Sequence, residues 1–168
     1  MLVNRASLTG ITKDDAGRVT GATVEADDRR ITVTTPTIVN ATGVWSDDIR
    51  ALDEGTHPDS IRPAKGVHIT VPWDLVQNDI AAVIPVPKDK RSVFVVAWDG
   101  STYIGTTDTD YEGDIDQPLC TRDDVEYLLR AINGAITGTI TPADVVGTWA
   151  GLRPLVQSAS SGRTAGLS

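Results

Sequence analysis

Residues 92–107 have the sequence SVFVVAWDGSTYIGTT, in which two runs rich in β-branched and aromatic residues flank the dipeptide Asp99-Gly100. An Asp-Gly pair between two such runs is typical of a β-hairpin. Two further β-rich runs, at 67–71 and 81–86, come before it and are separated by prolines and polar residues. Together the runs predict a four-stranded, largely antiparallel sheet.

A helix and a last strand are predicted after this sheet. Residues 121–124 (TRDD) are a typical helix start, and apolar residues recur at helical spacing from 125 to 132. We expect this amphipathic helix to cover one face of the sheet. Thr141 and Pro142 precede a predicted strand at 145–155.

The first third of the chain predicts a different unit. Residues 4–35 alternate between short β-rich runs and Asp/Gly turns, which indicates an antiparallel β-meander. An apolar strand is predicted at 37–43 and a helix at 45–52, with Ser46 as its N-cap. Residues 53–64 lack any period, so we expect the chain to cross between two structural units there. The predicted fold class is α+β.

Composition excludes several classes of function. The chain has 168 residues and a formal net charge of −8, from 15 Lys and Arg against 23 Asp and Glu. An acidic chain whose basic residues are scattered among acids argues against a nucleic-acid partner. A single cysteine, Cys120, with no Cys/His cluster argues against a disulfide framework and a metal site. With no apolar run of bilayer length and no signal peptide, we expect a cytoplasmic location.

Two basic side chains in the segment KGVH at 65–68 are candidates for substrate binding and proton transfer. Lys65 and His68 could both reach an anionic or hydroxyl-bearing substrate. Histidine is the usual base that accepts a proton from an alcohol, because its pKa lies close to neutral pH. The alternative for His68 is a hydrogen-bonded structural histidine in a strand.

An arginine and a Thr-Asp pair are further candidates. Arg153 lies in GLRPL at 151–155, where Gly151 clears space and a proline fixes the backbone, so its guanidinium could grip a carboxylate or phosphate. Thr107 and Asp108 end a predicted strand, and such ends often line a ligand cavity. The alternatives are a structural ion pair for Arg153 and a turn cap for Asp108.

Small residues at 41–43 (ATG) would let a backbone approach a bulky cofactor closely, although a tight strand-to-helix turn explains them as well. The chain contains no GxGxxG, GxxxxGK[ST], GxSxG or HExxH. It therefore lacks a complete cofactor or nucleophile motif, and nothing in its pattern supports a catalytic thiolate at Cys120.

Five segments in order closely resemble the middle of the FAD-dependent glycerol-3-phosphate dehydrogenases, which belong to the D-amino-acid-oxidase-like flavoprotein superfamily. They are NATGVW (40–45), RPAKGVHI (62–69), VFVVAW (93–98), IGTTDTDYEG (104–113) and WAGLRPL (149–155). The resemblance covers nearly the whole chain, and the order of the blocks is more specific than any one of them. In that family GxGxxG lies further toward the N-terminus, so we expect this chain to be a central fragment of a longer flavoprotein.

The resemblance implies two domains. Residues 1–52 and 145–168 would be parts of an FAD/NAD(P)-binding, Rossmann-like domain, incomplete because the GxGxxG segment is absent. Residues 60–144 would form the antiparallel substrate-binding sheet, covered by a helix. Contacts to FAD are implied for Ala41, Thr42, Gly43 and Trp45. On the substrate side the resemblance implies His68 and Arg153 as catalytic, and Arg153, Lys65, Thr107 and Asp108 as substrate-binding, with no metal.

The resemblance also implies a reaction. The whole protein would oxidise sn-glycerol 3-phosphate to dihydroxyacetone phosphate, with hydride passing to FAD and electrons to quinone, as a peripheral protein on the cytoplasmic face of the membrane. We expect the isolated chain to be inactive, to retain no FAD and to self-associate. Two alternatives stay open: a related flavin enzyme acting on an amino acid or 2-hydroxy acid, and a non-catalytic β-rich binding module.

Overall fold

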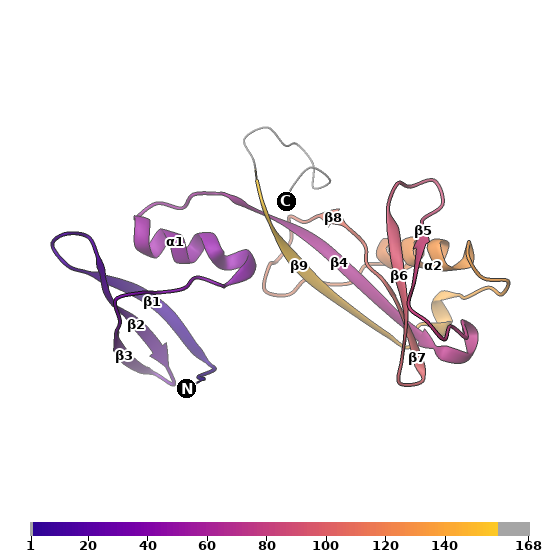
Figure 1. Cartoon of the computed structure of the whole chain (residues 1–168), viewed down its shortest axis with the longest axis horizontal. Coiled ribbons are helices and arrows are strands. Elements are labelled where there is room, and N and C mark those ends of the chain that lie inside the picture. The colour runs from indigo at the N-terminus through magenta and orange to yellow at the C-terminus, as the bar shows by residue number, and fades with distance from the viewer. Residues whose placement is uncertain (1, 158–168) are drawn as a thin grey trace. The chain divides into compact units, whose positions relative to one another are not determined.

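The structure, a computed structural model, describes residues 2–157. The chain divides into two compact units, with the boundary between Ile61 and Arg62. In the described residues most regular elements are antiparallel strands, accompanied by two α-helices and three short 3₁₀ turns (Figure 1). The predicted α+β class is confirmed.

The first unit contains the predicted meander. Strands β1 (Ala6–Lys13), β2 (Val19–Ala26) and β3 (Arg29–Thr34) pair antiparallel in that order. The two-residue turn between β2 and β3 has positive φ at both Asp27 (47°) and Asp28 (60°). This combination is what a tight hairpin turn requires, and Asp tolerates it better than most side chains.

The segment after the meander differs from the prediction in two ways. The strand expected at 37–43 does not form, because no strand of the described chain lies beside it to complete a hydrogen-bonded ladder. Helix α1 (Ser46–Glu54) follows a 3₁₀ turn, η1 (Gly43–Trp45). Ser46 is therefore the first helical residue and not the N-cap, and its hydroxyl donates to the Gly43 carbonyl.

One carboxylate of α1 ties the helix to the chain that leaves this unit. Asp47 is 3% exposed and accepts hydrogen bonds from the backbone N–H groups of Ser60 and Ile61 and from the Ser60 hydroxyl. Burial works to raise the pKa of Asp47, but the hydrogen bonds from Ser60 and Ile61 outweigh it and lower the pKa.

The second unit is built on one six-stranded sheet (Figure 1). The strand order is β5-β6-β7-β4-β8, and β9 also pairs with β4. The strands are β4 (Ile61–Pro72), β5 (Ala82–Pro85), β6 (Ser92–Trp98), β7 (Ser101–Gly105), β8 (Thr109–Asp110) and β9 (Gly147–Val156). The unit also contains two 3₁₀ turns, η2 (Trp73–Leu75) and η3 (Pro142–Asp144).

Helix α2 (Arg122–Asn133) covers one face of this sheet, as predicted. It begins with a capping box in which Thr121 and Asp124 satisfy each other's backbone N–H groups. The core joins sheet residues such as Val67, Ile69 and Ile104 to Leu128 and Ile132 of the helix, all at most 1% exposed. Each of these side chains contributes about 1.5–3 kcal/mol by leaving water. In residues 2–157 no helix is both long and apolar enough to span a membrane.

The domain assignment for the end of the chain stays a prediction. The resemblance implies that residues 145–168 belong with residues 1–52 to the FAD-binding domain. In the structure β9 pairs with β4, so Gly147–Val156 lies in the sheet of the second unit. Residues 158–168 of that predicted range lie outside the described residues.

Candidate functional site

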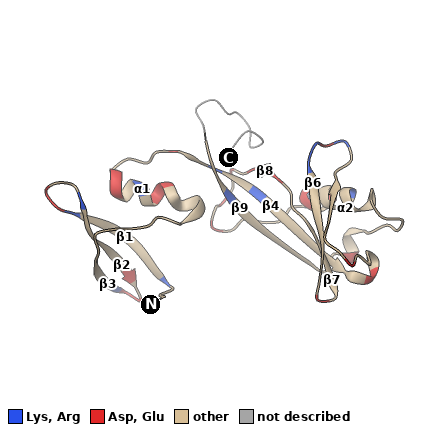
Figure 2. Cartoon of the chain, in the orientation of Figure 1, with Lys and Arg blue, Asp and Glu red and all other residues tan. Residues whose placement is uncertain are grey.

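The two faces of the second unit's sheet have different chemistry. Successive residues of a strand point to opposite faces, so Val67 and Ile69 of β4 point toward α2 while Gly66 and His68 point away. We call the face turned away from α2 the open face, and define it by Gly66, His68, Tyr103, Trp149 and Arg153. The ribbon in Figure 2 is blue, marking basic residues, on both β4 and β9, the strands that carry Lys65 and Arg153.

Arg153 is held by the loop between β7 and β8. Its Nη2 donates to the Thr106 hydroxyl (3.2 Å), and both terminal nitrogens donate to the Thr107 carbonyl (3.3 Å each). Its Nη1 also lies 3.4 Å from Asp108 Oδ1. The side chain remains 37% exposed. A guanidinium fixed in this way, with one part still open to solvent, can bind an anionic group such as a phosphate or carboxylate.

The side chain of Thr107 takes the place of a backbone carbonyl as a hydrogen-bond acceptor in the sheet. The Thr107 hydroxyl, 1% exposed as a residue, accepts from the Val67 N–H at 2.9 Å, and the Thr107 N–H donates to the Val67 carbonyl at 3.2 Å. The Thr107 carbonyl therefore points out of the ladder and accepts from Arg153. Thr107 thus holds Arg153 through its carbonyl, while the hydroxyl that accepts from Arg153 belongs to its neighbour Thr106, which is partly buried.

Gly66 makes room for the arginine. A Cβ at this position would lie 2.7 Å from Arg153 Nη2 and 2.6 Å from the Thr106 hydroxyl oxygen. Because real Cβ atoms do not approach other atoms so closely, any side chain at 66 would push the guanidinium away from the strand. This explains in physical terms why a glycine lies in the KGVH segment.

His68 lies on the same open face, stacked on an indole. Its ring centroid is 5.0 Å from that of Trp149, with an interplanar angle of 15°, and Tyr103 meets Trp149 edge-on, also at 5.0 Å. Gly105 pairs with His68 across β4 and β7, and a Cβ there would lie 2.4 Å from His68 Cδ2. Partial burial, reinforced by the positive charge of Arg153, lowers the pKa of His68. The imidazole is therefore neutral at neutral pH and can accept a proton.

Lys65 lies on the other face of β4 from His68 and Arg153. Its ammonium donates to Asp124 Oδ2 (2.6 Å) and to the Leu119 carbonyl (3.2 Å), and both side chains of the ion pair are at most 8% exposed. Burial works to raise the pKa of Asp124, but hydrogen bonds from Lys65 and Thr121 outweigh it and lower the pKa. Lys65 thus anchors the start of α2, and its substrate-binding role stays a prediction that the open face does not support.

The four residues predicted to contact FAD lie together in the first unit. Ala41 and Thr42 are exposed, Trp45 is 41% exposed, and Gly43 has a φ of 62° with no atom within 4 Å of an added Cβ. Asn40 braces the turn by accepting from the Thr42 hydroxyl (2.8 Å) and donating to the Ser46 carbonyl (2.9 Å). The turn is fixed and its backbone is accessible, which fits close approach by a bulky cofactor.

The described part of the chain gives no support for a metal site or for a nucleophilic cysteine. Residues 2–157 contain no group of three or more His, Cys, Asp or Glu side chains placed to hold a metal ion. Burial, together with the nearby Asp124 carboxylate, raises the pKa of the Cys120 thiol. A raised pKa keeps the thiol protonated and makes it a poor nucleophile.

Comparisons with known proteins agree on one family. The sequence model of the family described as FAD dependent oxidoreductase (DAO) matches residues 2–165. The chain is 39% identical over 160 residues to the alpha-glycerophosphate oxidase of Enterococcus casseliflavus, and 38% identical over 149 residues to the glycerol-3-phosphate dehydrogenase of Mycobacterium leprae. These alignments cover 92% and 87% of this chain but only 26% and 25% of the relatives, so the chain spans about a quarter of their length.

A solved structure is similar as well. The glycerol-3-phosphate dehydrogenase of Bacillus halodurans, solved in complex with FAD, matches with a TM-score of 0.80 and 33% sequence identity. The match covers 92% of this chain and 32% of that one.

Proposed function

Because the chain belongs to the DAO family of FAD dependent oxidoreductases, we propose that it is part of an enzyme that oxidises sn-glycerol 3-phosphate to dihydroxyacetone phosphate. The observation that carries the proposal is the pairing of an anchored cation, Arg153, with a neutral base, His68, on one open face. The names and the degree of identity of the relatives support glycerol 3-phosphate as the substrate.

Each residue has a role that follows from its chemistry. Arg153 binds an oxygen-rich anionic end of the substrate through the part of its guanidinium that the 106–108 loop leaves exposed. His68 accepts the proton of the secondary hydroxyl, because its lowered pKa keeps the imidazole neutral. The exposed turn formed by Ala41, Thr42, Gly43 and Trp45 would hold part of the FAD. FAD supplies the hydride acceptor that no side chain can provide.

The final electron acceptor belongs to the proposal too. We propose quinone, reached by a protein lying on the cytoplasmic face of the membrane. Molecular oxygen is the alternative, favoured by the oxidase among the relatives. Measuring reduction of a soluble quinone analogue beside hydrogen peroxide formation separates the two acceptors.

The 168-residue chain alone is proposed to be inactive and to retain no FAD, since it corresponds to about a quarter of its relatives. Self-association is also proposed, because Phe94 (54% exposed) and Trp98 (65%) lie exposed on β6. Size-exclusion chromatography with light scattering that shows a clean monomer would contradict it.

A second substrate class deserves the same test, because a guanidinium binds a carboxylate as readily as a phosphate. The experiment is a substrate panel on the full-length protein with FAD: glycerol 3-phosphate, glycine, sarcosine and a set of 2-hydroxy acids. Flavin reduction by glycerol 3-phosphate alone supports the proposal. Flavin reduction by an amino acid or a 2-hydroxy acid, with none by glycerol 3-phosphate, overturns it.

A further inference from the structure

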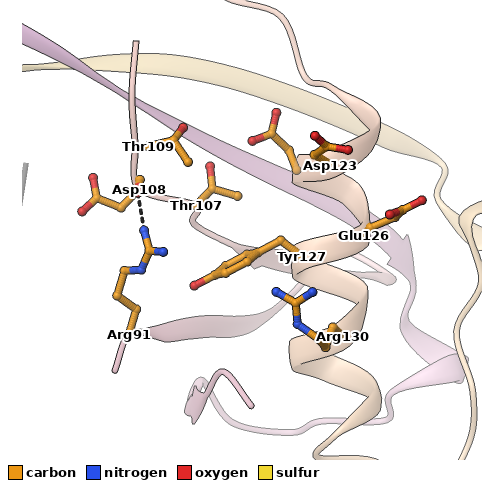
Figure 3. A pocket seen from close by; sticks show the side chains of 9 residues that line it. Arg91, Thr107, Asp108, Thr109, Asp123, Glu126, Tyr127 and Arg130 are labelled. Carbon is orange, nitrogen blue, oxygen red and sulfur yellow. Dashed lines mark hydrogen bonds between the residues drawn. The ribbon is translucent and has the colours of Figure 1, made fainter. Parts of the chain in front are cut away.

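A second arginine meets the loop that holds Arg153. Arg91 follows the turn between β5 and β6, and its Nη1 donates to the backbone carbonyl of Asp108 (Figure 3). The carboxylate of the same residue, Asp108, lies 3.4 Å from Arg153 Nη1. Asp108 is therefore held at its carbonyl by one arginine and at its side chain by another.

Arg91 is itself firmly placed. Its Nε and Nη2 donate to the Asp89 carboxylate at 2.8–3.2 Å, and its guanidinium lies 5.4 Å from the centroid of the Tyr127 ring. The Tyr127 hydroxyl also donates to Asp89, at 3.1 Å. Hydrogen bonds from Arg91 hold the pKa of the Asp89 carboxyl well below its usual range, so the pair stays charged in mild acid. Helix α2, through Tyr127, thus fixes the direction in which Arg91 points.

These groups line a pocket of about 340 Å³ beside the first turns of α2 (Figure 3). Thr107 and Asp108 form one wall, and Tyr127 and Arg130 form another. Arg91 therefore contacts the loop from a pocket that α2 lines, whereas Arg153 is not among the residues that line this pocket.

We propose that Arg91 is a positioning residue for Arg153: it fixes the Thr106–Asp108 loop from the α2 side, and the loop fixes the Arg153 guanidinium on the open face. That Arg91 positions Arg153 is inferred from the contacts described above. The effect of Arg91 on the binding of glycerol 3-phosphate rests on the proposed function. No other side chain of the described residues donates to the Asp108 carbonyl, so this link is not duplicated.

The test compares substitutions of Arg91 and Arg130, whose guanidinium groups both lie against the Tyr127 ring. Arg91→Lys keeps the charge, but a single ammonium cannot reproduce the fork that joins Asp89 to Asp108. Arg130→Ala removes the cation 5.3 Å from the Tyr127 centroid, and in the described chain Arg130 has no hydrogen bond to the loop. Arg130→Ala is therefore the matched control.

The first readout is NMR of the ¹⁵N-labelled 168-residue chain. In Arg91→Lys we expect the Arg153 Nε–H resonance to shift and hydrogen exchange of the Thr107 amide to accelerate about tenfold through local opening. The Ile69 and Ile104 amides, in the core of the sheet, should not change and so exclude global unfolding. Unchanged Thr107 and Arg153 signals in Arg91→Lys, or the same change in Arg130→Ala, would overturn the proposal.

The second readout is steady-state kinetics of the full-length, FAD-loaded protein. Arg91→Lys should raise KM for glycerol 3-phosphate about three- to tenfold with a smaller change in kcat, since substrate binding is the step affected. An unchanged KM would overturn the link to the substrate. If the wild-type protein does not oxidise glycerol 3-phosphate at all, the proposed function fails, and the NMR readout still decides whether Arg91 positions Arg153.

Discussion

The His68 imidazole lies nearly parallel to the Trp149 indole, with ring centroids 5.0 Å apart. Trp149 is in turn met edge-on by Tyr103, so β9 and β7 together hold the orientation of a side chain that β4 supplies. A base must present a fixed nitrogen to the proton that it accepts. The stack on the open face gives His68 that fixed orientation without a hydrogen-bonded partner on its ring in the described chain.

The two histidines should titrate on opposite sides of 6.5. Burial and Arg153 lower the pKa of His68, whereas hydrogen bonds to Asp59 and Asp48 raise the pKa of His57. We expect NMR titration to give a midpoint below 6.5 for His68 and above 6.5 for His57, with His57→Gln identifying the signals. Trp149→Leu should move the His68 midpoint up toward 6.5 by hydrating the ring. A His68 midpoint above that of His57 would contradict the account.

The same shifts predict how each histidine affects stability. The stability contributed by His68 is present above pH 6.5 and is lost as the pH falls through its lowered folded-state pKa, since the unfolded state then binds the proton more readily. His57 has the opposite sign: its contribution is present below pH 6.5 and is lost as the pH rises through its raised pKa. Urea unfolding of His68→Gln and His57→Gln from pH 5 to 8 checks both signs.

Breaking the buried Lys65–Asp124 pair should be costly. Both side chains are at most 8% exposed, so Lys65→Met leaves a buried carboxylate without its cation and should lower the free energy of unfolding by roughly 3–5 kcal/mol. Arg122→Ala breaks a 2.7 Å ion pair with Glu126 on the same helix, 89% and 51% exposed, and should cost less than about 1 kcal/mol. If urea unfolding shows the same loss of unfolding free energy in both variants, burial does not determine how strongly these ion pairs stabilise the fold.

Much of this architecture follows from local patterns. Short β-rich runs bounded by Asp/Gly turns predicted the meander and the hairpin of β6 and β7, and the segment TRDD at 121–124 predicted the start of α2. The prediction of a strand at 37–43 was wrong, because a strand forms only beside another strand to which it can hydrogen-bond. The local sequence pattern does not predict whether such a strand lies there.

The site was predicted less completely than the sheet. Lys65 and His68 are three residues apart on one strand, and the two-residue period of a strand places them on opposite faces, a signal that the sequence contained. By contrast, the contact of Arg91 with the Asp108 carbonyl and the stack of His68 on Trp149 join residues far apart in the chain. The sequence around Arg91 and around His68 contains no pattern that predicts these two contacts.

Glycine at 66 should be essential to the position of Arg153. Gly66→Ala places a Cβ 2.6–2.9 Å from the Thr106 hydroxyl and both terminal nitrogens of Arg153. We expect it to displace the guanidinium, shift the Arg153 Nε–H resonance and cost about 1–3 kcal/mol of stability. Gly151→Ala, with nothing within 4 Å of its added Cβ, is the control and should leave that resonance in place. A Gly66→Ala chain that behaves like Gly151→Ala would contradict the packing described here.

Arg153 on the open face is proposed to bind the anionic end of glycerol 3-phosphate. The most direct test is calorimetric titration of glycerol 3-phosphate into the full-length protein, with its FAD reduced under anaerobic conditions so that no turnover occurs. The wild type, Arg153→Ala and the exposed control Arg122→Ala would be compared. We expect Arg153→Ala to lose at least tenfold in affinity, about 1.4 kcal/mol, and Arg122→Ala to bind as the wild type does. Wild-type affinity in Arg153→Ala would contradict the proposed role of Arg153.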